Sequence, residues 1–298
     1  MTDFRLKVFL SVANHLSFTK ASQELFISQP AISKHIQELE SDFETRLFER
    51  RGNSIALTAS GELLIKHAEE LMEQYQHLEY AMHLLHGDYV GELKLGASTT
   101  IAQYVLPPIL ARFIELHPKV KLSLISGNTR EIEEAVETHR IDLGLIEGIY
   151  RRTNLKYTPF LEDQLITIAR KESALNIPNS ISINDLNQYP LILREQGSGT
   201  LDVIQRAFTE KGIKLKNLKV PLYLGSTESI KLFIQHSDAL GIVSTRAVKS
   251  DITVGRFREI EIQDIEMNRE FSFVSLQGEI VGLPAVFISF ASQYKKKL

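Results

Sequence analysis

The side chains with the most specific chemistry share one face of a helix predicted to begin just after Ser28. On a helical wheel with about 100° per residue, this face lies roughly 120° from the apolar stripe and holds no carboxylate. Its members are Gln29, Pro30, Ser33, Lys34 and Gln37. Gln can pair with N6 and N7 of adenine, Ser can donate or accept, and Lys can reach guanine or a phosphate. Such a face is typical of a helix that reads bases in DNA.

Two shorter helices are predicted to position this one. Apolar residues recur at helical spacing from Leu6 to Leu16, and a second apolar set follows Ser17, a good N-cap residue. Ser28 can cap the third helix, where Pro30 costs no hydrogen bond because the first helical N–H groups have no partner within the helix. The buried stripe of that helix is predicted to be Ile32, Ile36, Leu39 and Phe43.

Residues 47–58 form two strand-like runs around a polar Arg-Gly-Asn turn, which predicts a short hairpin, or wing. Arg50 and Arg51 beside this turn are predicted to contact phosphates or the minor groove. The complete set of predicted DNA contacts is Thr19, Ser28, Gln29, Pro30, Ser33, Lys34, Gln37, Arg50 and Arg51.

The alternative is that these segments form an ordinary small α domain, in which Ser33 and Lys34 belong to a solvated face. Residues 1–58 carry seven Lys or Arg against seven Asp or Glu, and the whole chain has a net charge of −3. Binding to DNA would therefore depend on where the charges lie and not on overall attraction.

A long helix is predicted over residues 59–87. Apolar residues alternate four and three positions apart, as in a coiled-coil seam: Leu64, Ala68, Leu71, Tyr75, Leu78, Met82 and Leu85. A helix of this length spans about 42 Å, more than a domain of about sixty residues covers. The seam predicts a homodimer, the alternative being an amphipathic helix on its own domain. The four histidines of this helix are expected to be solvated and not to bind a metal.

From Gly91 onward, strand-like runs alternate with helical ones, which predicts two α/β lobes with parallel strands. Ligands in such lobes bind at the carboxyl ends of strands, where helices begin. Three segments fit this rule and favour a small anion, with the predicted contacts Ser98, Thr99, Thr100, Asn128, Thr129, Gly197, Ser198, Gly199 and Thr200. Each segment taken alone is also what any helix start contains.

Composition excludes several classes of site. The chain of 298 residues has no Cys, so disulfides and thiolate metal sites are excluded, and no apolar run approaches the about 18 residues of a membrane span. With no signal segment recognised, we expect a cytoplasmic protein. The loop at residues 197–200 lacks a Walker lysine and the third glycine of a dinucleotide fingerprint. We expect no enzymatic activity and no cofactor.

Several motifs together resemble the LysR-type family of transcriptional regulators. At the N-terminus they are Ser17-Phe18-Thr19, Ser28-Gln29-Pro30-Ala31-Ile32-Ser33, Leu47-Phe48 and Leu57-Thr58, followed by Gly61; later they are Gly96-Ala97-Ser98-Thr99-Thr100 and Ile141-Asp142-Leu143-Gly144-Leu145. The resemblance implies an α/β fold class with a winged helix-turn-helix (1–58), a linker helix (59–87) and a two-lobed effector domain like periplasmic solute-binding proteins (88–298). Lobe one would comprise residues 88–162 and 266–298, and lobe two residues 163–265.

The resemblance also implies sequence-specific binding to double-stranded DNA, a small-molecule effector, and homodimers commonly assembled into homotetramers. A small-solute binding protein without a DNA role is the alternative function. The segment from Arg194 to Thr200 is similar to a subset of the family linked to sulfur oxyanions, but Leu201 stands where that subset commonly has Arg. This departure implies either that the ligand is a weaker or less charged acid or that another residue, such as Arg130, substitutes for the missing cation. A second departure is Phe43-Glu44, where the family usually has Leu-Gly, so we expect a different helix end there.

Overall fold

The computed structural model describes residues 3–51, 54–86, 89–149 and 151–295. It divides into two compact units, residues 1–87 and 88–298. Unit 1 contains four helices and one hairpin in its described part: α1 (Phe4–His15), α2 (Phe18–Glu24), α3 (Gln29–Asp42), β1 (Phe48–Arg51), β2 (Ser54–Leu57) and α4 (Ala59–His86).

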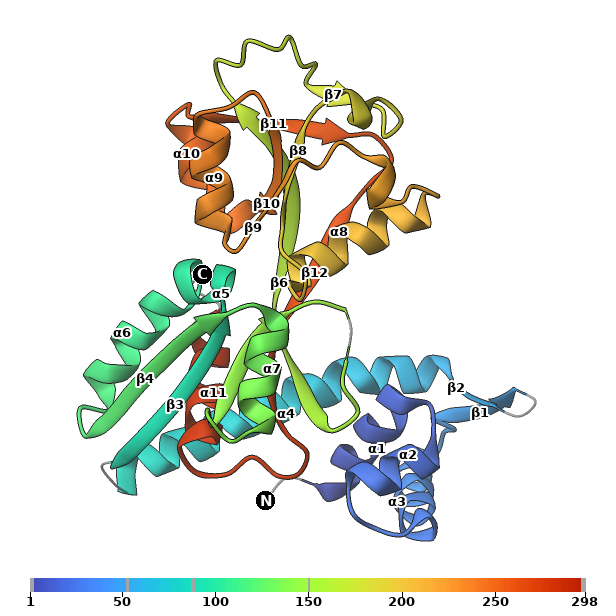
Figure 1. Ribbon diagram of the computed structural model, residues 1–298. Coiled ribbons are helices and arrows are strands. Elements are labelled where there is room, and N and C mark those ends of the chain that lie inside the picture. Colours follow the sequence, from blue (N-terminus) through green and yellow to red (C-terminus); the bar gives the residue numbers. More distant parts are fainter. Residues whose placement is uncertain (1–2, 52–53, 87–88, 150, 296–298) are drawn as a thin grey trace. The chain divides into compact units, whose positions relative to one another are not determined.

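Each short helix of unit 1 begins at a polar cap. Side-chain oxygens of Asp3, Ser17 and Ser28 accept hydrogen bonds from backbone N–H groups in the first turns of α1, α2 and α3. The helices enclose one apolar core, whose fully covered members include Phe9, Ile32, Leu39, Leu47 and Ala68. Figure 1 shows strands β1 and β2 extending away from this bundle.

Gly61 explains how α4 packs against the hairpin. A Cβ at this position would lie 2.3 Å from the carbonyl oxygen of Leu47, so a side chain cannot fit there. Thr58 precedes the helix; its hydroxyl accepts a hydrogen bond from the N–H of Gly61 (3.1 Å) and donates one to the carbonyl of Arg46 (2.6 Å). The Leu57-Thr58 and Gly61 motif therefore fixes where the wing joins the helix.

The end of α3 corrects the expectation of a different helix end. Glu44 adopts the left-handed conformation (φ 50°) that a glycine would adopt. Its N–H bonds to the carbonyl of Ser41 (3.2 Å), and that of Thr45 bonds to the carbonyl of Glu40 (3.0 Å). These two bonds are the Schellman arrangement. The end of α3 therefore has ordinary C-cap geometry. The only difference is that Glu44, and not a glycine, adopts the left-handed conformation.

Unit 2 contains two lobes, seen as the lower and upper parts of its ribbon in Figure 1. Lobe one holds β3 (Gly91–Ser98), α5 (Thr99–Tyr104), α6 (Leu106–Leu116), β4 (Val120–Gly127), α7 (Thr129–Glu137), β5 (Leu143–Glu147) and α11 (Gly282–Tyr294). Lobe two holds β7 (Ser180–Ile181), β8 (Leu191–Arg194), α8 (Gly199–Glu210), β9 (Leu222–Leu224), α9 (Thr227–Gln235), β10 (Leu240–Ser244), α10 (Thr245–Thr253) and β11 (Phe257–Ile262), with two short 3-10 helices, η1 (Asp185–Gln188) and η2 (Leu215–Asn217).

Two long strands connect the lobes, β6 (Leu155–Arg170) and β12 (Met267–Leu276). The sheet order is β4-β3-β5-β12-β6-β10-β8-β9. Strands β3, β4 and β5 are mutually parallel, as are β8, β9 and β10, which confirms the α/β character expected from the sequence. Strands β6 and β12 are antiparallel to each other, and β6 pairs with β12 up to Leu165 and with β10 from Leu165 onward.

Candidate functional site

The face predicted to read bases is open on α3. Gln29, Pro30, Lys34 and Gln37 are exposed, and Ser33 is half-buried on the same face. Thr19 is exposed on α2, whereas Ser28 caps α3 through its hydroxyl and the N–H of Ala31 (3.4 Å). The structure thus places the predicted α3 residues on one accessible surface.

Two of the three carboxylates of α3 are bound to other parts of unit 1, whereas Glu38 lies 3.9 Å from Lys34 on the same helix. Glu40 accepts from the backbone N–H of Leu47 (2.8 Å) and pairs with Arg46 (2.9 Å), which joins α3 to the hairpin. Asp42 pairs with Arg5 of α1 at 2.6 Å. These contacts direct the charges of Glu40 and Asp42 away from the α3 face, whereas Glu38 remains beside it as the partner of Lys34.

The wing is a two-stranded antiparallel hairpin. Arg50 lies opposite Ile55 and Arg51 opposite Ser54 in its register. The turn at residues 52–53 and the side chains of both arginines lie outside the described part of the chain. Their predicted phosphate contacts therefore stay predictions.

The apolar seam predicted on α4 has a buried part and an exposed part. Ala68 is fully buried in the core of unit 1, and Leu64 packs against that core. Leu71, Leu78 and Met82 are exposed by 56%, 56% and 48%. The first part of the predicted seam thus packs against its own domain, and the apolar surface available to a partner begins at Leu71; the side chain of Leu85 is outside the described part.

The structure brings most of the predicted effector residues to one place between the lobes. Ser98 ends β3, and Thr100, Thr129 and Thr200 lie in the first turns of α5, α7 and α8. All four are buried. Bonds between the lobes join them: Thr100 to Thr227 (3.2 Å), the N–H of Gly199 to Thr129 Oγ1 (3.2 Å), and the N–H of Arg130 to the carbonyl of Gly197 (3.1 Å). Asn128 caps α7 instead, and the side chain of Arg130 is exposed.

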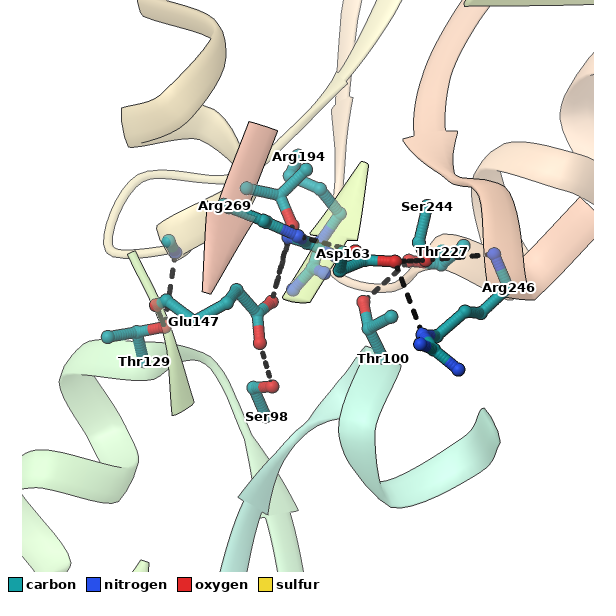
Figure 2. A network of polar contacts seen from close by, with 12 residues as sticks. Ser98, Thr100, Thr129, Glu147, Asp163, Arg194, Thr227, Ser244, Arg246 and Arg269 are labelled. Carbon is teal, nitrogen blue, oxygen red and sulfur yellow. Dashed lines mark hydrogen bonds and ion pairs between the residues drawn. The ribbon is translucent and has the colours of Figure 1, made fainter. Parts of the chain in front are cut away.

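A carboxylate that the sequence reasoning missed lies at the centre of these residues. Glu147, only 1% exposed at the end of β5, accepts from Ser98 Oγ and from Thr200 Oγ1 (3.2 Å). Arg269 of β12 lies 3.5 Å from Glu147 Oε1 and donates to Thr200 Oγ1 at 2.8 Å. Figure 2 shows Glu147 between Ser98 and Arg269.

Arg269 extends this network to a second buried acid. Its Nε donates to Asp163 Oδ2 at 2.7 Å, and Asp163 Oδ1 accepts from Ser244 Oγ at 2.7 Å. Arg246 lies 3.7 Å from the same carboxylate (Figure 2). Two acids, Glu147 and Asp163, and two guanidinium groups, those of Arg269 and Arg246, balance here, and the cation that lies between the two acids comes from β12.

Four buried donors of this region have no hydrogen-bond partner among the described residues. They are Thr99 Oγ1, Ser198 Oγ, Arg194 Nη1 and Arg269 Nη2. Arg194 is otherwise held by two bonds to Glu195 (2.8 and 2.9 Å). A guanidinium N–H can only donate, so these groups call for an acceptor.

Of the missed residues, Glu147 carries a signal that the sequence offers. It ends the apolar run that begins at Ile141 and forms β5, so the rule that indicated Ser98 applies to it equally. Asp163 and Arg269 carry no such signal, because they meet only through the register of β6 and β12. Among the described residues, no cluster of His, Asp or Glu is arranged to hold a metal ion, and no helix has an apolar stretch that could cross a bilayer.

Comparisons with known proteins cover both units. Residues 4–62 match the family described as bacterial regulatory helix-turn-helix protein, lysR family, and residues 86–293 match the LysR substrate binding domain. The HTH-type transcriptional regulator CysL of Bacillus subtilis (strain 168) is 32% identical over 269 residues, which cover 90% of this chain and 89% of CysL.

Two solved structures are similar to the chain. CrgA, a LysR-type transcriptional regulator from Neisseria meningitidis, gives a TM-score of 0.72 at 20% identity and covers 99% of both chains. The regulatory domain of CcmR from Synechocystis PCC6803, solved in complex with 2-PG, gives 0.62 at 27% identity; the match covers 70% of this chain and 99% of that domain.

The fold and the comparisons define a transcriptional regulator with a DNA-binding unit and an effector-binding unit, and not an enzyme. The chain belongs to the LysR family of transcriptional regulators. The expected winged helix-turn-helix, linker helix and two-lobed α/β domain are confirmed. A solute-binding protein without a DNA role is excluded, because residues 4–62 match the helix-turn-helix family.

Proposed function

We propose that this regulator reads a specific DNA sequence with the exposed face of α3 and binds a small anion between the lobes of unit 2. The observation that supports the first part is the open face of Gln29, Lys34 and Gln37, from which Glu40 and Asp42 are held away by their contacts with the hairpin and α1. Arg50 and Arg51 are the proposed phosphate contacts of the wing.

The DNA proposal is tested by fluorescence anisotropy on the sequence that the wild-type chain selects from random DNA. Gln29→Ala is expected to cost about 1–3 kcal/mol on the selected sequence and little on random DNA, whereas Arg51→Ala weakens binding to both and lowers the salt dependence. Gln74→Ala, an exposed substitution on α4, is the matched control. Equal losses on both DNAs for Gln29→Ala would rule out base reading.

The anion proposal rests on one observation, the buried donors that lack a partner: Ser198 Oγ, Arg194 Nη1 and Arg269 Nη2. Leaving a buried donor unsatisfied costs about 1–3 kcal/mol, and more for a charged group, so a ligand that supplies acceptors gains this energy on binding. Oxyanions and carboxylates present acceptor oxygens to both guanidinium and hydroxyl donors. The solved complex of the CcmR domain with 2-PG shows that a domain of this fold holds a ligand.

The anion proposal is tested by calorimetry of the full chain with sulfate, phosphate and small carboxylates. We expect one of these anions to bind and Ser198→Ala to weaken its binding several-fold, whereas Ser250→Ala, exposed on α10, leaves it unchanged. Preference for a cationic or apolar compound, undiminished by Ser198→Ala, contradicts both the ligand class and the position.

A further inference from the structure

Two hydroxyls already donate their protons to the carboxylate of Glu147. Ser98 Oγ donates to one carboxylate oxygen, and Thr200 Oγ1 donates to the other at 3.2 Å while accepting from Arg269. A hydroxyl has a single proton to donate. Neither Ser98 nor Thr200 can therefore donate to a bound anion while Glu147 keeps its position.

Glu147 also connects the two lobes. Ser98 belongs to lobe one and Thr200 to lobe two, so one carboxylate accepts hydrogen bonds from both. Arg269, on a strand shared by the lobes, supplies the positive charge at 3.5 Å. Hydroxyls from both lobes and one guanidinium are the set of donors that an anionic ligand would use, and here they surround a carboxylate of the protein itself.

The backbone of Glu147 is fixed, whereas its side chain has rotatable bonds. The carbonyl oxygen accepts from Thr129 Oγ1 at 2.7 Å and lies so near Gly199 that a Cβ there would be 1.8 Å away. The next residue, Gly148, has a φ of 133°, a conformation that favours glycine. Displacement of the carboxylate would therefore require rotation of the side chain and not movement of the backbone.

We propose that the Glu147 carboxylate is an internal occupant of the anion site, which holds the lobes together and with which an anionic effector competes. The inference rests on the proposed function only in placing the anion between the lobes. It makes Glu147 the residue that limits affinity: an anion must displace a negative charge that is already paired, and both charges cannot share the same donors. The cleft consequently responds to anions at high concentration or to those with more acceptor groups than one carboxylate.

The proposal is tested by titrating inorganic sulfate into the full chain by calorimetry. Glu147→Ala frees Ser98, Thr200 and Arg269, so sulfate is expected to bind at least about tenfold more tightly than to wild type, a change of about 1.4 kcal/mol. Glu147→Gln keeps the shape, removes the charge and is expected to gain at least about threefold; it serves if the alanine variant does not fold. Glu134→Gln, an equal charge change at an exposed position of α7, should have no effect.

A second substitution locates the gain. In Glu147→Ala, the additional change Thr200→Ala should remove most of the increase, because the freed hydroxyl is lost. The proposal is overturned if both Glu147 variants bind sulfate no more tightly than wild type does. It is also overturned if neither variant binds sulfate at all. Anions that bind wild type through Ser198, with no gain in the Glu147 variants, would leave the proposed function standing and refute this inference alone.

Discussion

Gly199 of lobe two packs directly against the backbone of lobe one. A Cβ added there would lie 1.8 Å from the carbonyl oxygen of Glu147 and 2.8 Å from Thr129 Oγ1, whereas ordinary contact begins at 3.4 Å. Gly199→Ala therefore forces α8 to move by about 1.6 Å, the difference between 3.4 and 1.8 Å. Both neighbours are fixed by the hydrogen bond between them, so the movement falls on the helix.

The magnitude follows from the contacts that this movement breaks. Two hydrogen bonds of 3.2 Å are lost, from the N–H of Gly199 to Thr129 and from Thr200 to Glu147. At about 1 kcal/mol each they contribute about 2 kcal/mol, and overpacking adds about 1–3 kcal/mol. For a unit of this size about 1 kcal/mol shifts the melting temperature by roughly 2–4 °C, so we expect a fall of at least about 6 °C.

Differential scanning calorimetry of the full chain measures this fall in the transition of unit 2. Gly225→Ala is the matched control, because this glycine also lies in lobe two and a Cβ there meets nothing within 4 Å. The control should have the same melting temperature as wild type. A Gly199→Ala transition within about 2 °C of wild type would refute the close packing of α8 on Glu147, since the expected shift is about three times larger.

Three further predictions concern other parts of the chain. Glu44→Gly should raise the melting temperature of unit 1, because a left-handed conformation costs a non-glycine residue about 1 kcal/mol; an unchanged or lower midpoint would contradict this. Burial, and to a lesser extent repulsion by Glu133, raises the pKa of Asp202 from 3.8 to about 6, so the folded state favours the protonated acid and loses stability as the pH rises from about 4 through 6. Asp202→Asn should consequently stabilise unit 2 more at pH 8 than at pH 5, which lie on either side of this pKa. Equal changes in melting temperature at pH 5 and pH 8, measured by calorimetry, would refute the raised pKa of Asp202. Leu71→Glu should weaken self-association in sedimentation velocity more than Gln74→Glu does, because Leu71 lies on the exposed apolar part of α4; equal behaviour of the two variants would exclude this surface as the interface.

The elements that are regular over a short stretch of sequence were predictable. The polar caps Ser17 and Ser28 and the apolar periodicity after them define α2 and α3, because helix periodicity and capping are local properties. Of the long strand β6, only the apolar end at residues 165–169 has a sequence pattern that predicts a strand. Its earlier part contains Pro159, opposite Ser272 at a shift in register, and runs between lobes with mixed exposure. No alternating pattern survives in such a strand.

The polar part of the candidate site was predictable, and the charged part was not. Ser98 and Thr200 follow from the rule that ligands bind at strand ends and helix starts. Asp163 and Arg269 are 106 residues apart and meet because two strands pair in a particular register, which single-sequence patterns do not contain. The Schellman geometry at Glu44 was mispredicted for a related reason, since the tertiary fold can hold a non-glycine residue in a left-handed conformation.

The most direct test of the central claim is selection of DNA from a random library by the full chain, with wild type and Gln29→Ala processed in parallel. We expect wild type to enrich one defined sequence and Gln29→Ala to lose the preference for a particular base at one position of each half-site, because a single side chain reads that base. Enrichment of the same sequence, with the same preference at every position, by both proteins would contradict the claim, as would the absence of any enriched sequence with wild type.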